Sequence, residues 1–234
     1  MSASLDKLRA VRKQLKTRTA LADELAAEEK SLAPRVTNQQ KVESTARDQE
    51  RQKALQQEGP LWNATLAAYK QKVTAYDFTG ARDVITAAKV SEASLRDAQG
   101  ILQKKAQWLV DWKNKLIEDI NRTHFTGEIT DMNGAKYSGI DSATAQSVSM
   151  KIGPYGSAQV GWTKLPPKTL LAVSGSFIKP GVADVADREW LSAVFAVETG
   201  QAEAAHPLAD AAAKAKPEYR EMLGPLFAPT PTPH

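Results

Sequence analysis

The fold is decided in the middle of the chain, by residues 125–165, which read FTGEITDMNGAKYSGIDSATAQSVSMKIGPYGSAQVGWTKL. Apolar and polar residues alternate here with a period of two, which is typical of half-buried β-strands. Asn133-Gly134 stands between the first two alternating runs and is a strong hairpin signal. Two further runs alternate in the same way: Val148, Met150 and Ile152, then Ala158, Val160 and Trp162. The stretch therefore predicts a small four-stranded antiparallel β meander.

On both sides of this stretch the spacing of apolar residues changes to the three-and-four rhythm of helices. Residues 59–123 carry one such stripe followed by others, which predicts a helical bundle: the first stripe is Trp62, Leu66, Tyr69, Val73 and Tyr76. After Pro166-Pro167, residues 166–227 predict shorter helices, of which the alanine-rich one is expected to begin near His206 because Pro207 follows. An isolated four-stranded sheet is marginally stable, so we expect its apolar face to pack on helices. The predicted fold class is α+β, mainly α.

The first 58 residues are lean in large apolar side chains, and most of these follow an imperfect seven-residue pattern. Two heptad positions carry it: Leu8, Leu15, Ala22 and Val36 on one, Val11, Leu25 and Leu32 on the other. Arg18 and Glu29 interrupt the pattern, so it favours a long helical hairpin or a modest coiled coil. Pro34 removes a backbone donor and predicts a kink or a break. Gly59-Pro60 predicts the end of this segment and the start of a new helix at Pro60.

These changes of rhythm divide the chain into five segments. They are N-terminal long helices, a helical bundle, the small β unit, a C-terminal helical pair and a tail, at 1–58, 59–123, 124–165, 166–227 and 228–234. The proline-rich tail is predicted to be extended.

Residues able to carry catalysis or bind metals are sparse. The chain has no cysteine, which excludes disulfides and thiolate sites. Its three histidines, His124, His206 and His234, lie far apart, and no nucleophile motif or phosphate-binding loop occurs. Three carboxylates gather at Asp184, Asp187 and Glu189, where charge at a helix N-terminus explains them. We therefore expect no enzyme, no catalytic residue, no cofactor, no metal and no small-molecule substrate.

The expected function is a scaffold or protein-interaction module that binds a partner protein or forms a homo-oligomer. The candidate partner-binding residues are the heptad leucines and one tryptophan outside the helical stripes: Leu8, Leu15, Leu25, Leu32 and Trp108. The alternative is nucleic-acid binding through the most basic helix face. The side chains of that face are Lys7, Arg9, Arg12, Lys13, Lys16 and Arg18. Both signs of charge are interleaved along the chain, and its net charge is only +4, which favours the first reading.

No run in the sequence approaches the ~18 apolar residues of a membrane span. The basic N-terminus lacks the apolar core of a signal peptide, so none is predicted. A segment upstream of this chain stays an open alternative.

Two parts of the chain resemble tetratricopeptide repeats. In the C-terminal pair, Gly200, Ala205, Ala212 and Pro217 stand where that family places its turn glycine, two small packing residues and a terminal proline. Ala81, Ile85 and Ala88 match the second helix of a repeat, although Tyr69 is displaced from the usual aromatic position. The resemblance covers about a quarter of the chain and implies paired helices with a binding groove.

The order of elements resembles the non-catalytic C-terminal regions of large bacterial kinase-like receptors. The residues that carry this likeness are Val160-Gly161-Trp162-Thr163-Lys164-Leu165, at the end of the β unit and ahead of the repeat-like pair. The kinase motifs themselves are missing, and Asp77-Phe78-Thr79 matches the metal-binding triplet in letters only. This resemblance implies an extracytoplasmic or periplasmic binding module.

Overall fold

The computed structural model describes residues 6–7, 10–11, 20–153, 156–179, 181 and 183–228. These residues form a mainly helical protein with one four-stranded antiparallel sheet, so the predicted α+β class is confirmed. The chain divides into two compact units, residues 1–57 and residues 58–234. The predicted bundle, β unit and C-terminal helices all lie in the second unit, which is described first.

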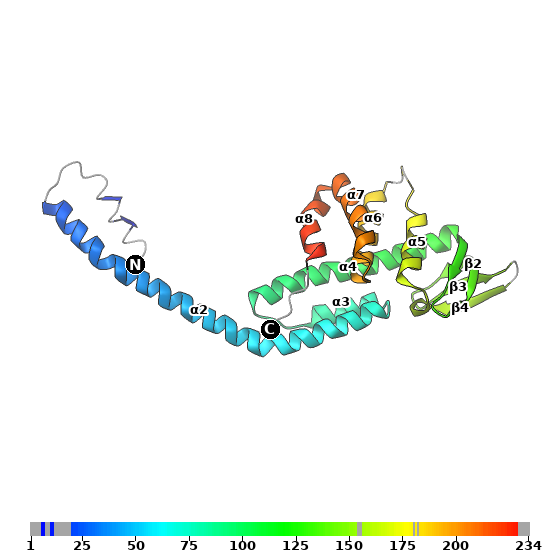
Figure 1. Ribbon diagram of the computed structural model, residues 1–234, viewed down its shortest axis with the longest axis horizontal. Helices are drawn as coiled ribbons and strands as arrows, with labels where there is room; N and C mark the ends of the chain where they lie inside the picture. The colour runs from blue at the N-terminus through cyan, green and yellow to red at the C-terminus, as the bar shows by residue number, and fades with distance from the viewer. Residues whose placement is uncertain are drawn as a thin grey trace. The chain divides into compact units, whose positions relative to one another are not determined.

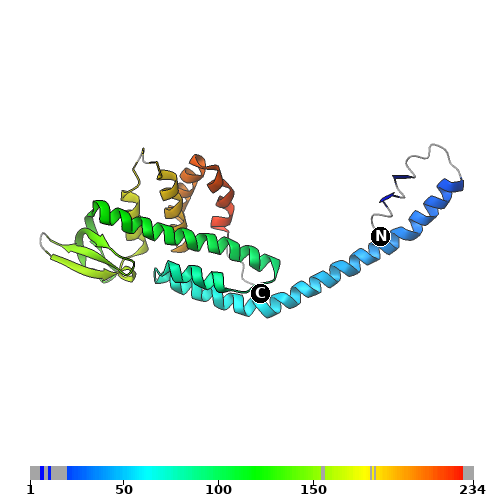
Figure 2. The same ribbon diagram turned by 180° about the vertical axis from the view of Figure 1, so that it is seen from behind.

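Helix α4 (Ala93–Thr123) runs lengthwise through the second unit (Figures 1 and 2). The last turns of α2 (Ala20–Thr74) and α3 (Phe78–Ala87) lie along one side of it. Helices α5 (Pro167–Ser176), α6 (Val185–Glu198), α7 (Ala202–Ala215) and α8 (Pro217–Phe227) lie on the other side. The sheet packs at the C-terminal end of α4, as the marginal stability of a small sheet requires.

The sheet is a simple meander in the order β1-β2-β3-β4. Its strands are β1 (Phe125–Thr130), β2 (Lys136–Ala143), β3 (Ser147–Ile152) and β4 (Gly156–Gly161). Gly134 has φ +84° in the first hairpin, a left-handed conformation that glycine adopts without strain. Alternation buries one face of the sheet, as the period of two predicts, and its large buried side chains are Ile129, Ile140, Val148, Met150 and Val160.

The continuity of α2 contradicts two predictions. The chain is helical without interruption from Ala20 to Thr74, so the helix end expected at Gly59-Pro60 is wrong, and of the kink or break expected at Pro34 the break is excluded. The residues on both sides of Pro34 are mostly good helix formers and do not favour a turn. The helix therefore continues, although Pro34 has no backbone N–H to donate to the preceding turn. After Pro60, the fully buried Trp62 and the residues one turn further on bind the helix to the core. A helical hairpin within residues 20–58 is therefore excluded.

The starts of α4 and α7 are set in different ways. The N-cap of α4 is Glu92, whose carboxylate accepts from Leu95 N at 3.0 Å. The preceding Ser91 N donates to Glu58 Oε2 at 2.9 Å and so joins this loop to α2. Helix α7 begins at Ala202 rather than at His206, with Pro207 inside it. Pro207 is the sixth residue of α7, two residues beyond the first turn, so the helix loses the one hydrogen bond that an N–H at this position would donate.

Aromatic rings fill the centre of the second unit. Trp112 of α4 stacks on Phe195 of α6, with ring centroids 3.7 Å apart and an interplanar angle of 9°. Phe78 meets both rings edge-on, and Tyr76 stacks on Phe195 at 6.3 Å. Phe78, Trp112 and Phe195 are at most 2 % exposed, so these rings form the hydrophobic centre that holds α3, α4 and α6 together.

The first unit consists, in its described part, of residues 6–7 and 10–11 and the helical residues 20–57 of α2. Leu25 and Leu32 are half-buried there. From Thr37 to Lys53 every side chain of α2 is exposed. A helix that is polar all round gains no stability from a core, so this stretch depends on its own backbone hydrogen bonds and side-chain pairs such as Gln39 with Glu43.

Candidate functional site

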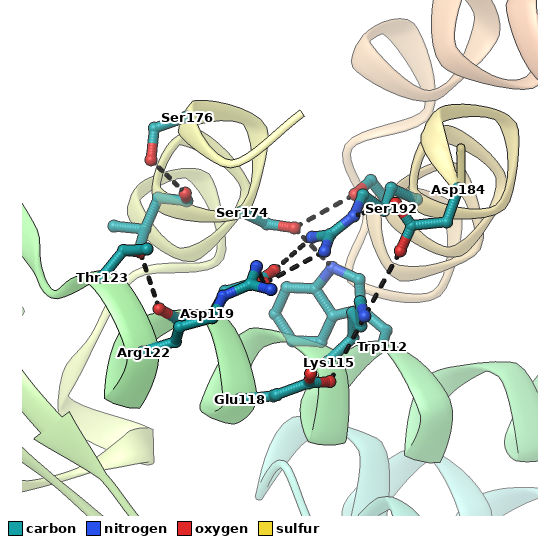
Figure 3. Close-up of polar contacts among 12 residues, drawn as sticks. Trp112, Lys115, Glu118, Asp119, Arg122, Thr123, Ser174, Ser176, Asp184 and Ser192 are labelled. Atoms are coloured by element: carbon teal, nitrogen blue, oxygen red, sulfur yellow. Dashed lines mark hydrogen bonds and ion pairs between the residues drawn. The ribbon is translucent and has the colours of Figure 1, made fainter. Parts of the chain in front are cut away.

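A buried ion pair joins α4 to α6 in the second unit (Figure 3). Arg188 donates to Asp119 through both terminal nitrogens, and Nη2 lies 3.0 Å from Oδ1. Arg188 Nε also donates to Asp184 Oδ1 at 2.9 Å, and Asp184 in turn pairs with Lys115 at 3.3 Å. The side chains of Asp119 and Arg188 are 2 % and 8 % exposed, so both charges are withdrawn from water and neutralise one another.

Polar contacts continue from this pair to α5. Trp112 Nε1 donates to Ser174 Oγ at 3.1 Å, and Ser174 Oγ lies 3.2 Å from Ser192 Oγ (Figure 3). Each of these polar atoms has a partner on a neighbouring helix. A network satisfied in this way fixes how α4, α5 and α6 pack, and it presents no free nucleophile or base.

A second buried pair lies between α4 and the end of α6. Lys105 Nζ lies 3.1 Å from Glu198 Oε1, and Tyr69 Oη of α2 donates to Glu198 Oε2 at 2.9 Å. Burial and the neighbouring Glu198 carboxylate raise the pKa of Tyr69 well above its ordinary value. The phenol therefore stays protonated and donates its hydrogen bond. The negative charge of Glu198 is neutralised by Lys105.

The candidate site is a cleft of about 490 Å³ in the second unit. It lies where the α2–α3 turn, the second half of α4, the β2–β3 turn and the short 3-10 turn after β4 meet. Phe78, Val110 and Ile117 give it an apolar wall, and Asn114, Gln146 and Thr163 supply uncharged polar groups at its rim. Lys113 is its cation, and it comes from α4.

The ammonium of Lys113 is held by backbone oxygens. Nζ donates to Tyr76 O at 2.9 Å and to Ala145 O at 2.8 Å, and it stands 5.2 Å from the centroid of the Trp162 ring. Within the described part of the chain, no carboxylate forms an ion pair with it. Burial lowers the pKa of Lys113, and the charge of Asp77 opposes that effect only in part. The cleft thus presents a partly desolvated cation without a direct counter-ion.

Asp77 lines the same cleft but is already engaged. Its carboxylate accepts from Lys72 Nζ at 2.7 Å and from Gly80 N at 2.9 Å, where it caps α3. The Lys72 hydrogen bond, followed by the one from Gly80, holds the pKa of Asp77 below its ordinary value. Asp77 therefore stays charged at neutral pH, and its charge is largely balanced by Lys72.

A second hollow of about 650 Å³ adjoins the cleft, because Ala75, Tyr76 and Thr163 line both. Its surface is more apolar and includes Val73, Pro167 and Met132. Met132 lies in the first hairpin and is 66 % exposed. Together the two hollows form one depression, which we call the Tyr76 groove, with a cationic half at Lys113 and an apolar half at Met132.

The Tyr76 turn itself is rigidly held. Tyr76 has φ +54°, and its side chain is 5 % exposed. Its hydroxyl donates to Leu165 O at 3.1 Å, and burial raises the pKa of the phenol to about 12. The floor between the two hollows is therefore preorganised rather than a loop that must order on binding.

The predicted partner-binding residues fall into three groups. Leu8 and Leu15 lie outside the described residues, while Leu25 and Leu32 lie on α2, seven residues apart and half-buried. Trp108 is half-buried on α4 and packs edge-on against Trp190 of α6, with centroids 5.3 Å apart. The leucines belong to the first unit and Trp108 to the second, and their binding role stays a prediction.

The basic face named for nucleic acid lies mostly beyond the described residues. Lys7 is exposed, and Arg9, Arg12, Lys13, Lys16 and Arg18 are not described. Nucleic-acid binding therefore stays a prediction.

The three carboxylates at the start of α6 act separately. Asp184 pairs with Arg188, and Asp187 accepts from Lys216 at 2.6 Å. Burial raises the pKa of Glu189.

Sequence reasoning missed Lys113. Lysine is common on helices, and its carbonyl partners Tyr76 and Ala145 stand 37 and 32 residues away along the chain. The only local signal was the neighbouring Trp112, which marks the buried side of α4.

Comparisons with known protein families, with curated proteins and with solved structures find no match for this chain. No group of three or more metal-ligand side chains occurs among the described residues. Nor is any described helix long and apolar enough to cross a membrane. Two surfaces of the described residues are candidates for binding: the α2 heptad leucines, Leu25 and Leu32, and the Tyr76 groove.

Proposed function

We propose that this protein is a non-catalytic interaction module that assembles through the N-terminal part of α2, with a second copy of the chain as its partner. The observation that carries the proposal is the exposure of every side chain from Thr37 to Lys53 in a continuous helix. Isolated helices are marginal in water, and most helical stability in proteins comes from packing. The polar stretch has no apolar face of its own to pack, so we expect a second chain to stabilise the helix at its apolar repeat, Leu25 and Leu32.

We place the assembly surface at the seven-residue repeat. Leu25 and Leu32 are separated by one heptad and are half-buried, while Val36, four residues further on and on the other heptad position, is already buried within the chain. Repeats of this kind pack against the same positions of a second helix. The repeat is short and interrupted, so we expect an association in the micromolar range, about 8 kcal/mol, rather than a permanent oligomer.

The experiment is light scattering on the full chain over a range of concentrations. We expect a dimer that dissociates on dilution, and a monomer at every concentration for the double variant Leu25→Ser/Leu32→Ser. Val42→Ser is the matched control, because Val42 is an exposed apolar residue of the same helix outside the two heptad positions. A monomeric wild-type chain, or a dimer that survives in the double variant, rejects the assembly.

The tetratricopeptide-like pair fits the same proposal as a second helical surface. Helices α6 and α7 pack against each other through a turn at Gly200, whose φ is +80°, and Ala205 and Ala212 are fully buried. These features support a repeat-like pair and also suit any close helix crossing. We propose the repeat ancestry on the residue pattern alone.

A further inference from the structure

All residues of the Tyr76 groove lie in the second unit, whereas the proposed assembly surface of α2 lies in the first. The groove is therefore a separate candidate binding site. We propose that the groove binds an extended peptide of a partner protein, with an acidic side chain paired to Lys113 and an apolar side chain in the hollow beside Met132.

The charge balance of the groove is the first argument. Two carboxylates line it, and each already has its own cation: Asp77 has Lys72, and Glu198 has Lys105. Lys113 is the cation left without a carboxylate in the described part of the chain. An ammonium carries three protons, and two of them are donated to Tyr76 O and Ala145 O. The third is available to an acceptor in the cleft.

The electrostatic environment favours a carboxylate. The ammonium is partly desolvated between two carbonyls and the Trp162 ring, so a ligand anion gains more from it than from an exposed lysine. Asn114, Gln146 and Thr163 lie around the same cleft and can donate hydrogen bonds to further ligand oxygens.

The shape of the groove points to a peptide. Two open hollows adjoin across Ala75, Tyr76 and Thr163, one with a cation and one with an apolar surface. In an extended chain, alternate side chains point to the same side, ~6.5–7 Å apart. Such a chain places an acidic and an apolar side chain into adjoining hollows. The 66 % exposure of Met132 marks the apolar hollow as a contact surface, because methionine adapts to varied partners.

The test uses the immobilised full chain and three pools of nonapeptides, acetylated and amidated at their ends. The fifth residue is glutamate in one pool, glutamine in the second and lysine in the third, so the pools differ in charge only at this position. Positions three and seven are mixed leucine, isoleucine, valine and phenylalanine, and the remainder are serine, alanine and asparagine. Retention is measured by mass spectrometry. We expect the glutamate pool to be retained about tenfold over the glutamine pool and the lysine pool least.

Variants assign the binding to the groove. Lys113→Met is expected to abolish the preference for glutamate, and Lys104→Met, an exposed lysine of the same helix, to leave it unchanged. Thr163→Phe is expected to reduce retention of all pools, because the larger side chain fills the boundary between the two hollows. This variant tests the groove even if Lys113→Met fails to fold. The double variant Leu25→Ser/Leu32→Ser is expected to retain peptides normally, which separates this result from that for α2.

Three outcomes overturn the proposal: equal retention of the pools, retention of none, or a preference for glutamate that survives Lys113→Met. Sodium succinate serves as a free carboxylate in a parallel calorimetric titration. Binding of succinate that requires Lys113, with no retention of any peptide, would assign the cleft to small carboxylates and reject the peptide.

Discussion

Arg188 and Asp119 are 69 residues apart in the chain and form a pair of charges that is almost completely buried. Breaking such a pair leaves an uncompensated charge in the core, which costs about 3–5 kcal/mol. We expect Arg188→Met to lower the free energy of unfolding by that amount, as measured by urea denaturation followed by tryptophan fluorescence.

The matched control for this prediction is Arg122→Met. Arg122 also contacts Asp119, at 2.9 Å, but its side chain is 60 % exposed, so we expect a change of at most about 1 kcal/mol. The double variant Asp119→Leu/Arg188→Met removes both charges and should cost clearly less than the two single changes added together. Additive costs would contradict the buried pair as the cause.

The sheet could be predicted from the sequence because its determinants are local. Asn133-Gly134 specifies the turn, and a period of two fixes which side chains face the core. Val148 pairs with Val160 and Met150 with Ala158, so the residues that alternate together in the sequence do face each other. The class and order of elements followed from such local patterns.

The predictions that failed concerned features that depend on the combined helix propensity of many residues or on contacts between residues far apart in the chain. Pro34 is a strong local signal, but the many good helix formers around it together outweigh one lost hydrogen bond. Lys113 gained its environment only through Tyr76 and Ala145, far away along the chain, so no pattern in α4 marks it. The cleft residues were therefore beyond sequence reasoning, whereas Trp62, which the helical stripe marks, is buried in the core as expected.

Trp190 and Trp112 differ in one respect that stability measurements can detect. Trp112 Nε1 has Ser174 as its acceptor, whereas Trp190 Nε1 is buried without a partner among the described residues. Replacement by phenylalanine removes similar volume from both sites, but at Trp190 it also removes an unsatisfied donor. We expect Trp190→Phe to destabilise less than Trp112→Phe, by about 1–2 kcal/mol in urea unfolding. An equal or larger cost at Trp190 would show that its Nε1 does find an acceptor.

Two glycines should respond to alanine in opposite directions. Gly134 has φ +84°, where a Cβ is strained whatever the surrounding space, so Gly134→Ala should cost about 1 kcal/mol. Gly100 lies within α4, and a Cβ there meets no atom within 4 Å. Gly100→Ala should therefore stabilise the protein by about 0.5–1 kcal/mol. Thermal unfolding followed by circular dichroism checks both, and a destabilised Gly100→Ala would disprove the open surface at that position.

Asp184 gives the protein an acid-sensitive contact between α4 and the start of α6. Burial alone would raise its pKa, but the hydrogen bonds from Arg188 and Lys115 outweigh that effect and lower it. Its contribution to stability is therefore complete above the unfolded-state pKa, about 4, and is lost as the pH falls through the lower folded-state pKa.

We expect Asp184→Asn to cost at most about 1 kcal/mol at pH 7, because the carboxylate is 32 % exposed. The variant should also lose less stability than the wild type between pH 5 and pH 2, since it has one fewer charge to protonate. Urea midpoints measured across that range test this. Asp48→Asn, at an exposed aspartate of α2 without a carboxylate contact to α4 or α6, is the matched substitution for comparison. Parallel pH profiles for Asp184→Asn and the wild type would mean that Arg188 and Lys115 do not favour the charged carboxylate, and the bridge from α4 to α6 would then depend on Asp119 alone.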